Sequence, residues 1–317
     1  MAAPSTPHGF YPFIHILRGF APLIVAWSHL AMLFVATNGI NWQGADIWTA
    51  YVGKPLHIYQ YGGHIGVVIF FFVSGFIITH ASLSETRTEF AIKRVLRIFP
   101  ILAVALAVTA TARWISLSFG LGEIIGTKPG GFWDYVQAFF LYDMVSAQPQ
   151  LLSVTWTLVT ELAFYAMTLL LLGSTRLNPE RATYAMIGLW VAIEMVWSGN
   201  PAITYLHFFT LYLGLLIMGR VLYLADTGIV GWRKSIPMLL LLPTLFALFY
   251  SNIQPGVLFG SAPEPGAAYI VAFMVFLCCM TYGASRVPRV VSFFADISLS
   301  LYLLHIPVGM LVVAATF

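Results

Sequence analysis

The chain has 317 residues, of which 60% are hydrophobic and only 9% are charged, and its formal net charge is +3. Soluble domains carry about 25% charged residues, so this composition excludes a soluble protein and indicates an all-α, polytopic membrane protein. Neither a phosphate-binding Walker loop nor a dinucleotide-binding glycine motif is present. We expect one membrane-embedded domain over residues 1–317. We expect no cleaved signal peptide, because the first apolar segment has no small-residue cleavage site after it.

Apolar stretches predict nine membrane spans, at residues 13–35, 63–82, 98–117, 153–173, 183–199, 203–224, 236–251, 267–283 and 294–316. With a cytoplasmic N-terminus, most basic residues fall in cytoplasmic loops, as the positive-inside rule requires. They are Arg87, Lys93, Arg94, Arg97, Arg176, Arg181, Arg220, Arg233, Lys234, Arg286 and Arg289. The odd span count places Phe317 outside. A tenth span arises if the aromatic stretch 130–142 crosses the membrane, although we prefer an interfacial helix there.

The first span carries Arg18 and His29, eleven positions apart. On a helix this spacing places both side chains within ~20° on one face and ~16 Å apart along the axis. Ionisable groups inside a membrane are costly and mark functional sites by default. The alternative is that Arg18 reaches the headgroups and His29 is a hydrogen-bonded core histidine. For the pair on one face, we favour function.

The second span contains Gly66 and the pair Ser74-Gly75, and small residues of this kind favour close helix packing. The loop that follows it, residues 85–100, carries Arg94 and Arg97 on one helical face, before Pro100 starts or kinks the next span. The segment fits a membrane-surface anchor, and it also fits a cradle for phosphates, because guanidinium groups bind phosphate bidentately. On this segment alone the anchor is favoured.

The fourth span contains Trp156, Glu161 and Tyr165. A buried carboxylate must be protonated or paired, and the natural partners of Glu161 are Arg18, His29 or a substrate hydroxyl. A purely structural pair between Glu161 and an arginine is the alternative, and it would place the fourth span against the first.

Other polar residues give weaker signals. We expect Glu194 to be interfacial, and the aromatic loop 36–62 fits an interfacial belt better than a sugar-stacking platform. The scattered histidines lack metal-ligand spacing, the adjacent Cys278 and Cys279 suggest no metal site, and we expect no metal. The histidines expected to be satisfied locally are His57, His64, His80 and His207.

The last span begins near Asp296, which we expect to cap its N-terminus. Ser298, Tyr302 and His305 recur at helical spacing, so a polar stripe enters the membrane. Pro307 follows and predicts a kink just after His305.

Five of these segments together resemble the acyltransferase-3 family of membrane O-acyltransferases. They are LRGFAPLIVAWSH at 17–29, GVVIFFFVSGFIIT at 66–79, KRVLRIFP at 93–100, WTLVTELAFY at 156–165 and ISLSLYLLHIP at 297–307. Members of this family acylate lipopolysaccharide O-antigen, exopolysaccharides, peptidoglycan, Nod factors and some macrolides. The resemblance implies transfer of an acyl group, expected to be acetyl, from acyl-CoA to a carbohydrate or glycolipid hydroxyl, in a bacterial inner membrane.

The resemblance also implies roles for individual residues. His29 would be the general base, Arg18 would steady negative charge on the donor or the developing oxyanion, and Glu161 would orient His29 or hold the substrate. The expected acyl-CoA-binding residues are Arg94, Arg97 and Ser74, and the expected substrate-binding residues are Trp156, Tyr165, Tyr302 and His305. We expect contacts with membrane lipid and none with nucleic acid. The rival hypothesis is a transporter or flippase in which the buried Arg, His and Glu form a relay.

Overall fold

The computed structural model describes residues 11–38, 42–58, 60–120, 131–146, 150–198, 204–251, 266–283 and 286–316, which form helices and no strand. The long helices are α1 (Pro12–Asn38), α4 (Gly63–Ser84), α5 (Arg87–Ser118), α8 (Trp156–Leu170), α10 (Pro179–Ser198), α12 (Leu213–Asp226), α13 (Trp232–Tyr250), α14 (Gly266–Tyr282) and α16 (Ser298–Thr316). The short ones are α2 (Gln43–Trp48), η1 (Thr49–Gly53), α3 (Lys54–Leu56), η2 (Gln60–Gly62), α6 (Phe132–Phe139), α7 (Tyr142–Val145), η3 (Ser153–Thr155), α9 (Leu172–Leu177), α11 (Thr204–Leu211) and α15 (Arg289–Asp296).

Each predicted span contains a helix. Among the described residues, six helices are long and apolar enough to cross a membrane, or seven if α15 and α16, which meet at a 74° bend, form one span. The two remaining predicted spans correspond to α10 and to the shorter apolar helix α14. The all-α, polytopic fold is therefore confirmed, whereas the count of nine or ten spans stays a prediction.

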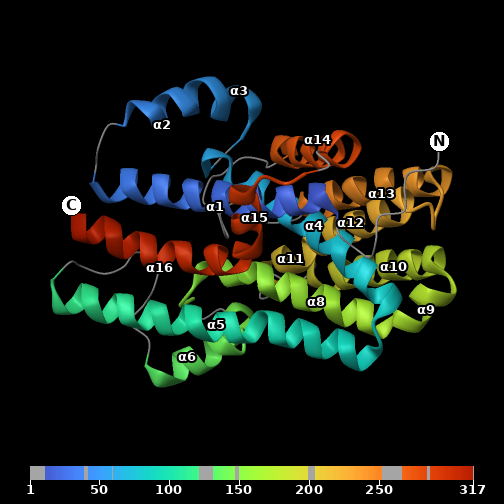
Figure 1. Ribbon diagram of the computed structural model, residues 1–317, viewed down its shortest axis with the longest axis horizontal. Helices are drawn as coiled ribbons and strands as arrows, with labels where there is room; N and C mark the ends of the chain where they lie inside the picture. Colours follow the sequence, from blue (N-terminus) through green and yellow to red (C-terminus); the bar gives the residue numbers. More distant parts are fainter. Residues whose placement is uncertain are drawn as a thin grey trace.

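The long helices lie roughly along one axis in Figure 1. Helices α1, α5 and α16 end on the left of that view, whereas α4 runs back to the right, where the turn into α5 lies. Side-chain contacts join the elements at this right-hand end: Arg176 of α9 donates to the backbone carbonyls of Ser82 and Glu85, and Lys234 of α13 pairs with Glu180 of α10 at 2.6 Å. Basic residues therefore gather at the end that is predicted to face the cytoplasm.

Helix α4 packs against α1 on one side and α12 on the other. A Cβ atom on Gly66 would lie 2.6 Å from the carbonyl oxygen of Ala21 in α1, and one on Gly75 would overlap the carbonyl of Leu216 in α12. Small residues let membrane helices approach until their backbones touch. The packing role predicted for these glycines is confirmed.

The basic segment after α4 is helical from Arg87 onwards, so the expectation of a loop over residues 85–100 is wrong. The hydroxyl of Thr86 accepts from the Glu89 amide (3.2 Å), and the Glu89 carboxylate accepts from the Thr86 amide (2.8 Å). This capping box starts α5 before its apolar part begins. Helix α5 then continues through Pro100, which lies inside it rather than at its start.

Two charged residues that we expected at the surface are buried. Glu194 is 0% exposed, and its carboxylate lies 2.7 Å from Nδ1 of His207, so the interfacial placement is wrong. Arg220, counted among the loop residues, is also 0% exposed within α12 and donates to the hydroxyls of Thr183 (2.9 Å) and Thr175 (3.3 Å). Partners on neighbouring helices explain both, because burial of a charge requires such compensation.

The last predicted span is divided in two. Asp296 ends α15 rather than capping α16, which begins at Ser298 after the 74° bend. The carboxylate of Asp296 lies instead 3.6 Å from Nε2 of His15 in α1. Asp296 therefore faces α1 from the end of α15, and the predicted cap is wrong.

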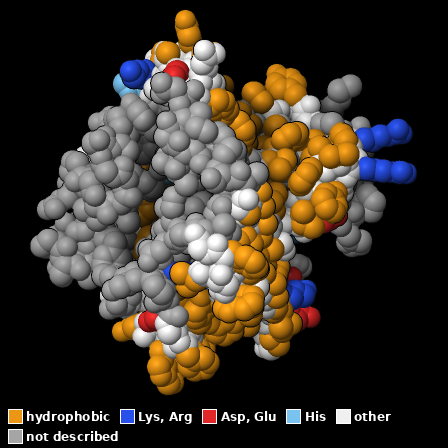
Figure 2. Space-filling view, turned by 90° about the vertical axis from the view of Figure 1, so that its left-hand side faces the viewer, with side chains coloured by type: hydrophobic (Ala, Val, Ile, Leu, Met, Phe, Trp, Pro, Cys, Tyr) orange, Lys and Arg blue, Asp and Glu red, His pale blue; other side chains and the backbone are white. Residues whose placement is uncertain are grey.

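The aromatic stretch 130–142 contains α6, whose eight residues are too few to cross a bilayer. Phe132 and Trp133 at its start are 75% and 70% exposed. Figure 2 shows hydrophobic side chains over much of the described surface of the molecule. Such a surface suits lipid rather than water, as expected for an integral membrane protein.

Candidate active site

Helix α1 presents two polar side chains to α16, at two depths. Arg18 donates from Nη2 to the hydroxyl of Ser298 at 3.4 Å, and Nδ1 of His29 lies 2.7 Å from Nε2 of His305. Because the two contacts are made to the same neighbouring helix, Arg18 and His29 share a face of α1, as their spacing predicts.

The two imidazole rings meet edge to edge. Their planes lie within 9° of each other and their centroids are 5.0 Å apart. The nitrogens are 2.7 Å apart, well inside the ~3.5 Å of ordinary contact between stacked atoms, so nearly parallel rings at this distance must meet through their edges. His305 is 5% exposed, whereas His29 is half-buried. His29 is therefore the more accessible member of the pair.

Tyr302 anchors the same stretch of α16 to the start of α8. Its hydroxyl donates to the carbonyl of Val154 and accepts from the hydroxyl of Thr157, both at 3.1 Å. Its ring lies parallel to that of Phe70 in α4, with centroids 6.0 Å apart. With its hydroxyl bonded in this way, Tyr302 fixes the position of α16 beside His29.

Glu161 joins α8 to α4 and is 1% exposed. It accepts hydrogen bonds from Ser74 at 3.1 Å and from Tyr165 at 2.5 Å. Arg18 and Arg97 both lie within electrostatic reach of its carboxylate. The structure thus groups Glu161 with the two arginines and not with His29, its other predicted partner.

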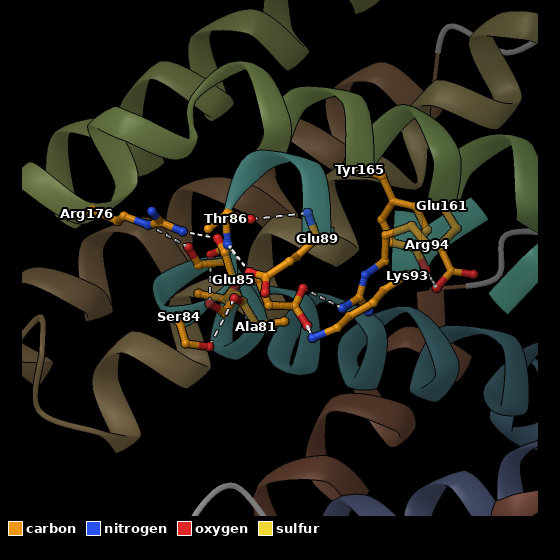
Figure 3. A network of polar contacts seen from close by, with 12 residues as sticks. Ala81, Ser84, Glu85, Thr86, Glu89, Lys93, Arg94, Glu161, Tyr165 and Arg176 are labelled. Carbon is orange, nitrogen blue, oxygen red and sulfur yellow. Dashed lines mark hydrogen bonds and ion pairs between the residues drawn. The ribbon is translucent and has the colours of Figure 1, made fainter. Parts of the chain in front are cut away.

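Arg94 and Arg97 differ in their surroundings, although they lie one turn apart on α5. Nη2 of Arg94 forms an ion pair with Glu85 at 3.0 Å, and Lys93 pairs with the same carboxylate at 3.0 Å, as Figure 3 shows. The Arg94 guanidinium also lies over the Tyr165 ring, 5.9 Å from its centroid. Arg97 is half-buried and forms no hydrogen bond within the described part of the chain. Arg97 is therefore the freer cation.

Trp156 lies apart from these polar groups. Its ring contacts those of Phe71, Phe208 and Tyr212, with centroids 5.0 to 5.8 Å apart. It packs within an aromatic cluster, and the structure brings no polar site residue against it through the contacts described. Its substrate-binding role stays a prediction.

Two of the other histidines, His64 and His80, are satisfied locally, as expected. His64 bonds the hydroxyl of Tyr269 at 2.9 Å, and His80 bonds that of Tyr223 at 3.0 Å. Nowhere among the described residues do three or more potential ligands gather as they would around a metal ion.

Sequence reasoning missed two contributors to the site. Glu85, which holds Arg94, carries no motif of its own, although its place just before the capping box at Thr86 puts it beside the first turns of α5. Thr157, which bonds Tyr302, lies next to Trp156 in the segment 156–165, one of the five that resemble the family. Neither contact follows from spacing, because each joins residues on different helices.

Asp143 lies outside the spans, in α7, and is 3% exposed. It accepts from the backbone amide of Leu151 at 3.3 Å, while Oδ1 has no hydrogen-bond partner among the described residues. Burial raises the pKa of this carboxyl above its ordinary value, and the backbone hydrogen bonds oppose that rise. Through Leu151, Asp143 holds the segment that leads into η3 and α8.

Comparison with known proteins shows the family to which the chain belongs. The sequence model of a family described as an acyltransferase domain, Acyl_transf_3, matches residues 11–315. This chain belongs to the acyltransferase-3 family. The match covers all the helices that carry the polar groups described above, and it confirms the resemblance found in the sequence.

A curated relative of this acyltransferase is Nodulation protein 10 of Rhizobium leguminosarum bv. viciae. The two are 32% identical over 218 residues, which are 60% of this chain and 54% of the relative. The matched part thus spans about half the length of that protein. No solved structure matches this acyltransferase.

Proposed function

We propose that this membrane acyltransferase moves an acyl group, expected to be acetyl, from cytoplasmic acyl-CoA to a hydroxyl of a surface polysaccharide or its lipid-linked precursor. A location in a bacterial inner membrane, with the N-terminus in the cytoplasm, is part of the proposal. The observation that carries it is His29, which is half-buried and holds His305 through Nδ1. Its other nitrogen, Nε2, is bonded by no residue that the structure describes. An alcohol is a weak nucleophile and needs such a base.

In the proposed reaction, the acceptor hydroxyl gives its proton to Nε2 of His29 while its oxygen forms a bond to the thioester carbon. The C–S bond then breaks, and the leaving thiolate takes the proton back from His29. The products are an ester and CoA with a free thiol, and His29 ends as it began. The proton, the electron pairs and the acyl group all balance without a metal or a redox partner.

The arginines suit the donor rather than the oxyanion. Arg18 lies eleven positions before His29, ~16 Å away along α1, and within electrostatic reach of Arg97 and Glu161. At that depth Arg18 and Arg97 would bind the donor's phosphates, and Glu161 would hold the two cations in place. Arg94 would join them only by exchanging its ion pair with Glu85 for a phosphate.

The test is release of free thiol by the purified protein in lipid nanodiscs, supplied with acetyl-CoA and candidate acceptor glycans. Acceptor-dependent thiol release that is lost in His29→Gln supports the proposal. The acyl content of surface polysaccharide in a strain that lacks the gene then names the acceptor. If the protein neither binds acetyl-CoA nor releases thiol, the proposal is contradicted. The transporter hypothesis is then favoured.

A further inference from the structure

The hydrogen bonds around His29 and His305 form a chain with a fixed direction. Nδ1 of His305 lies 2.7 Å from the carbonyl oxygen of Tyr302 and 3.3 Å from that of Leu301. A carbonyl oxygen can only accept, so the hydrogen in these contacts must belong to the histidine. Nδ1 of His305 therefore carries a proton.

That proton determines the next bond in the chain. In a neutral imidazole one nitrogen donates and the other accepts, so with Nδ1 protonated, Nε2 of His305 is an acceptor. Nε2 faces Nδ1 of His29 at 2.7 Å. A bond of this length requires a proton between the two nitrogens, and His29 must supply it. His29 is thus left with Nδ1 protonated and with its lone pair on Nε2.

The opposite direction would require a charged His305. If His305 donated from both nitrogens it would be an imidazolium, 5% exposed, and no carboxylate among the described residues contacts either ring. Burial of an unpaired charge costs far more than burial of a neutral, hydrogen-bonded ring. The neutral chain is the one that the surroundings favour.

We propose that His305 is a positioning residue that fixes His29 in the Nδ1-protonated tautomer, so that Nε2 of His29 faces the acceptor hydroxyl as a base. The expected effect of His305 on the rate rests on the proposed function. The expected tautomer of His29 follows from the hydrogen bonds alone and does not depend on that function. When His29 takes up the hydroxyl proton, its Nδ1–H bond to His305 strengthens, because charge-assisted hydrogen bonds are the stronger ones. His305 thus takes the orienting part that Glu161 was expected to play.

The tautomer is measured by nitrogen NMR on protein that carries ¹⁵N only in histidine, with the His29 signals assigned by their loss in His29→Gln. We expect a protonated Nδ1 and an unprotonated Nε2 in the wild type, and loss of that preference in His305→Leu, which cannot accept. His305→Gln presents an amide oxygen near the position of Nε2 and should restore the preference. A wild-type His29 protonated on Nε2 overturns the proposal, even if the protein proves to have no acyl-transfer activity.

Kinetics supply the second readout. His305→Leu should lower kcat by about 10²-fold with an unchanged KM for the donor, and His305→Gln should recover at least about a tenth of the wild-type kcat. His80→Leu is the matched control, because His80 is a partly buried histidine bonded to a tyrosine away from this pair, and its kcat should stay at the wild-type value. Equal kcat in wild type and His305→Leu overturns the positioning role, whereas absence of turnover in the wild type itself contradicts the proposed function instead.

Discussion

Two groups of charged and titratable side chains lie inside this bundle, and they differ in access. The open cluster, Arg18, His29, Arg97, Glu161 and His305, lies among α1, α5, α8 and α16, and its two arginines and His29 are only half-buried. The sealed cluster comprises two separate sites among α10 to α13, the pair Glu194 and His207 and, beside Thr183 about 16 Å away along α10, Arg220. Each of the three side chains is at most 1% exposed.

The histidines show what the difference means. Both nitrogens of His207 face polar atoms of the protein, with Nδ1 2.7 Å from the Glu194 carboxylate as an ion pair and Nε2 3.2 Å from the carbonyl of Phe249. Among the residues that the structure describes, His29 is bonded at Nδ1 alone, by His305. A histidine with both nitrogens held by the protein stabilises the fold, whereas one with a free nitrogen and access to substrate can move a proton. Burial and a polar partner alone do not separate structure from chemistry.

The largest effect should come from His29→Gln. Glutamine can hydrogen-bond but cannot accept the proton, so kcat should fall by about 10²- to 10⁴-fold, while acetyl-CoA binding and thermal stability stay at wild-type values. Turnover assays and calorimetric binding on the same preparation measure both. Substantial turnover by this variant would make His29 a positioning residue. The contrast between His29 and His207 would then be wrong.

The sealed cluster should respond in stability instead. Glu194→Leu leaves His207 buried without its partner, and loss of one member of a buried pair costs about 3 kcal/mol or more. The double variant Glu194→Leu, His207→Leu should regain part of that loss, because no buried polar group is then left alone. Denaturant unfolding in detergent measures the free energies, and turnover per folded molecule should not change. A loss of turnover with unchanged stability would place this pair in the chemistry.

Donor binding should separate the arginines of the two clusters. Arg97→Ala should weaken acetyl-CoA binding about tenfold, and the difference from wild type should shrink modestly as salt is raised, because salt still screens part of an interaction between half-buried charges. Arg220→Met is the matched control, and its affinity for acetyl-CoA should remain that of the wild type. If both variants lose the same affinity for acetyl-CoA, Arg97 affects donor binding only by stabilising the fold and does not contact the donor.

A smaller change in donor affinity is expected at Glu85, which lies beside the start of α5. Glu85→Gln removes the carboxylate that holds Arg94 and Lys93, so Arg94 becomes available to a donor phosphate. Acetyl-CoA should bind about threefold more tightly, because the phosphate no longer has to displace a carboxylate from Arg94. Weaker binding would show that Glu85 positions Arg94 for the donor rather than competing with it.

The smallest effect, on stability, is expected at Asp143, a buried carboxyl outside the spans. Its raised pKa means that the folded protein holds this proton more tightly than the unfolded chain. This carboxyl therefore favours folding at acid pH, and that contribution is lost as pH rises through the raised pKa. Asp143→Asn should raise the melting temperature at pH 7, with a gain that disappears as pH falls below the ordinary value of 3.8. A gain that does not depend on pH would have another cause.

Sequence patterns predicted much of the fold, because length and hydropathy identify membrane helices without knowledge of their neighbours. Helix α4 illustrates this, since its ends and its packing glycines agree with the prediction. The start of α5 was missed, because a polar capping box, not hydropathy, sets it. Glu194 was misplaced for a related reason: its partner His207 lies on another helix, and no spacing within α10 indicates it.

The candidate site was predicted residue by residue but not in its connections. Spacing indicated that Arg18 and His29 share a face, since that depends on one helix alone. The partner of His29 is 276 positions away in the chain, and only the packing of α1 against α16 determines it. Glu161 was assigned to Arg18, His29 or a substrate hydroxyl. Its carboxylate accepts from Ser74 and Tyr165 and lies within electrostatic reach of Arg18 and Arg97, and these contacts depend on how the helices pack.

Helix α1 also fixes the distance between the two functional side chains that it carries. Its backbone touches α4 at Gly66 and α15 at Gly19, so it cannot slide or turn without clashes, and the distance from Arg18 to His29 is set by the rise of one helix at ~16 Å. If phosphate is held at Arg18 and acyl transfer occurs at His29, the donor must carry its acyl carbon at the end of a long arm. A pantetheine thioester meets that requirement. An acyl phosphate or an acyl adenylate, whose acyl carbon is attached directly to phosphate, does not reach.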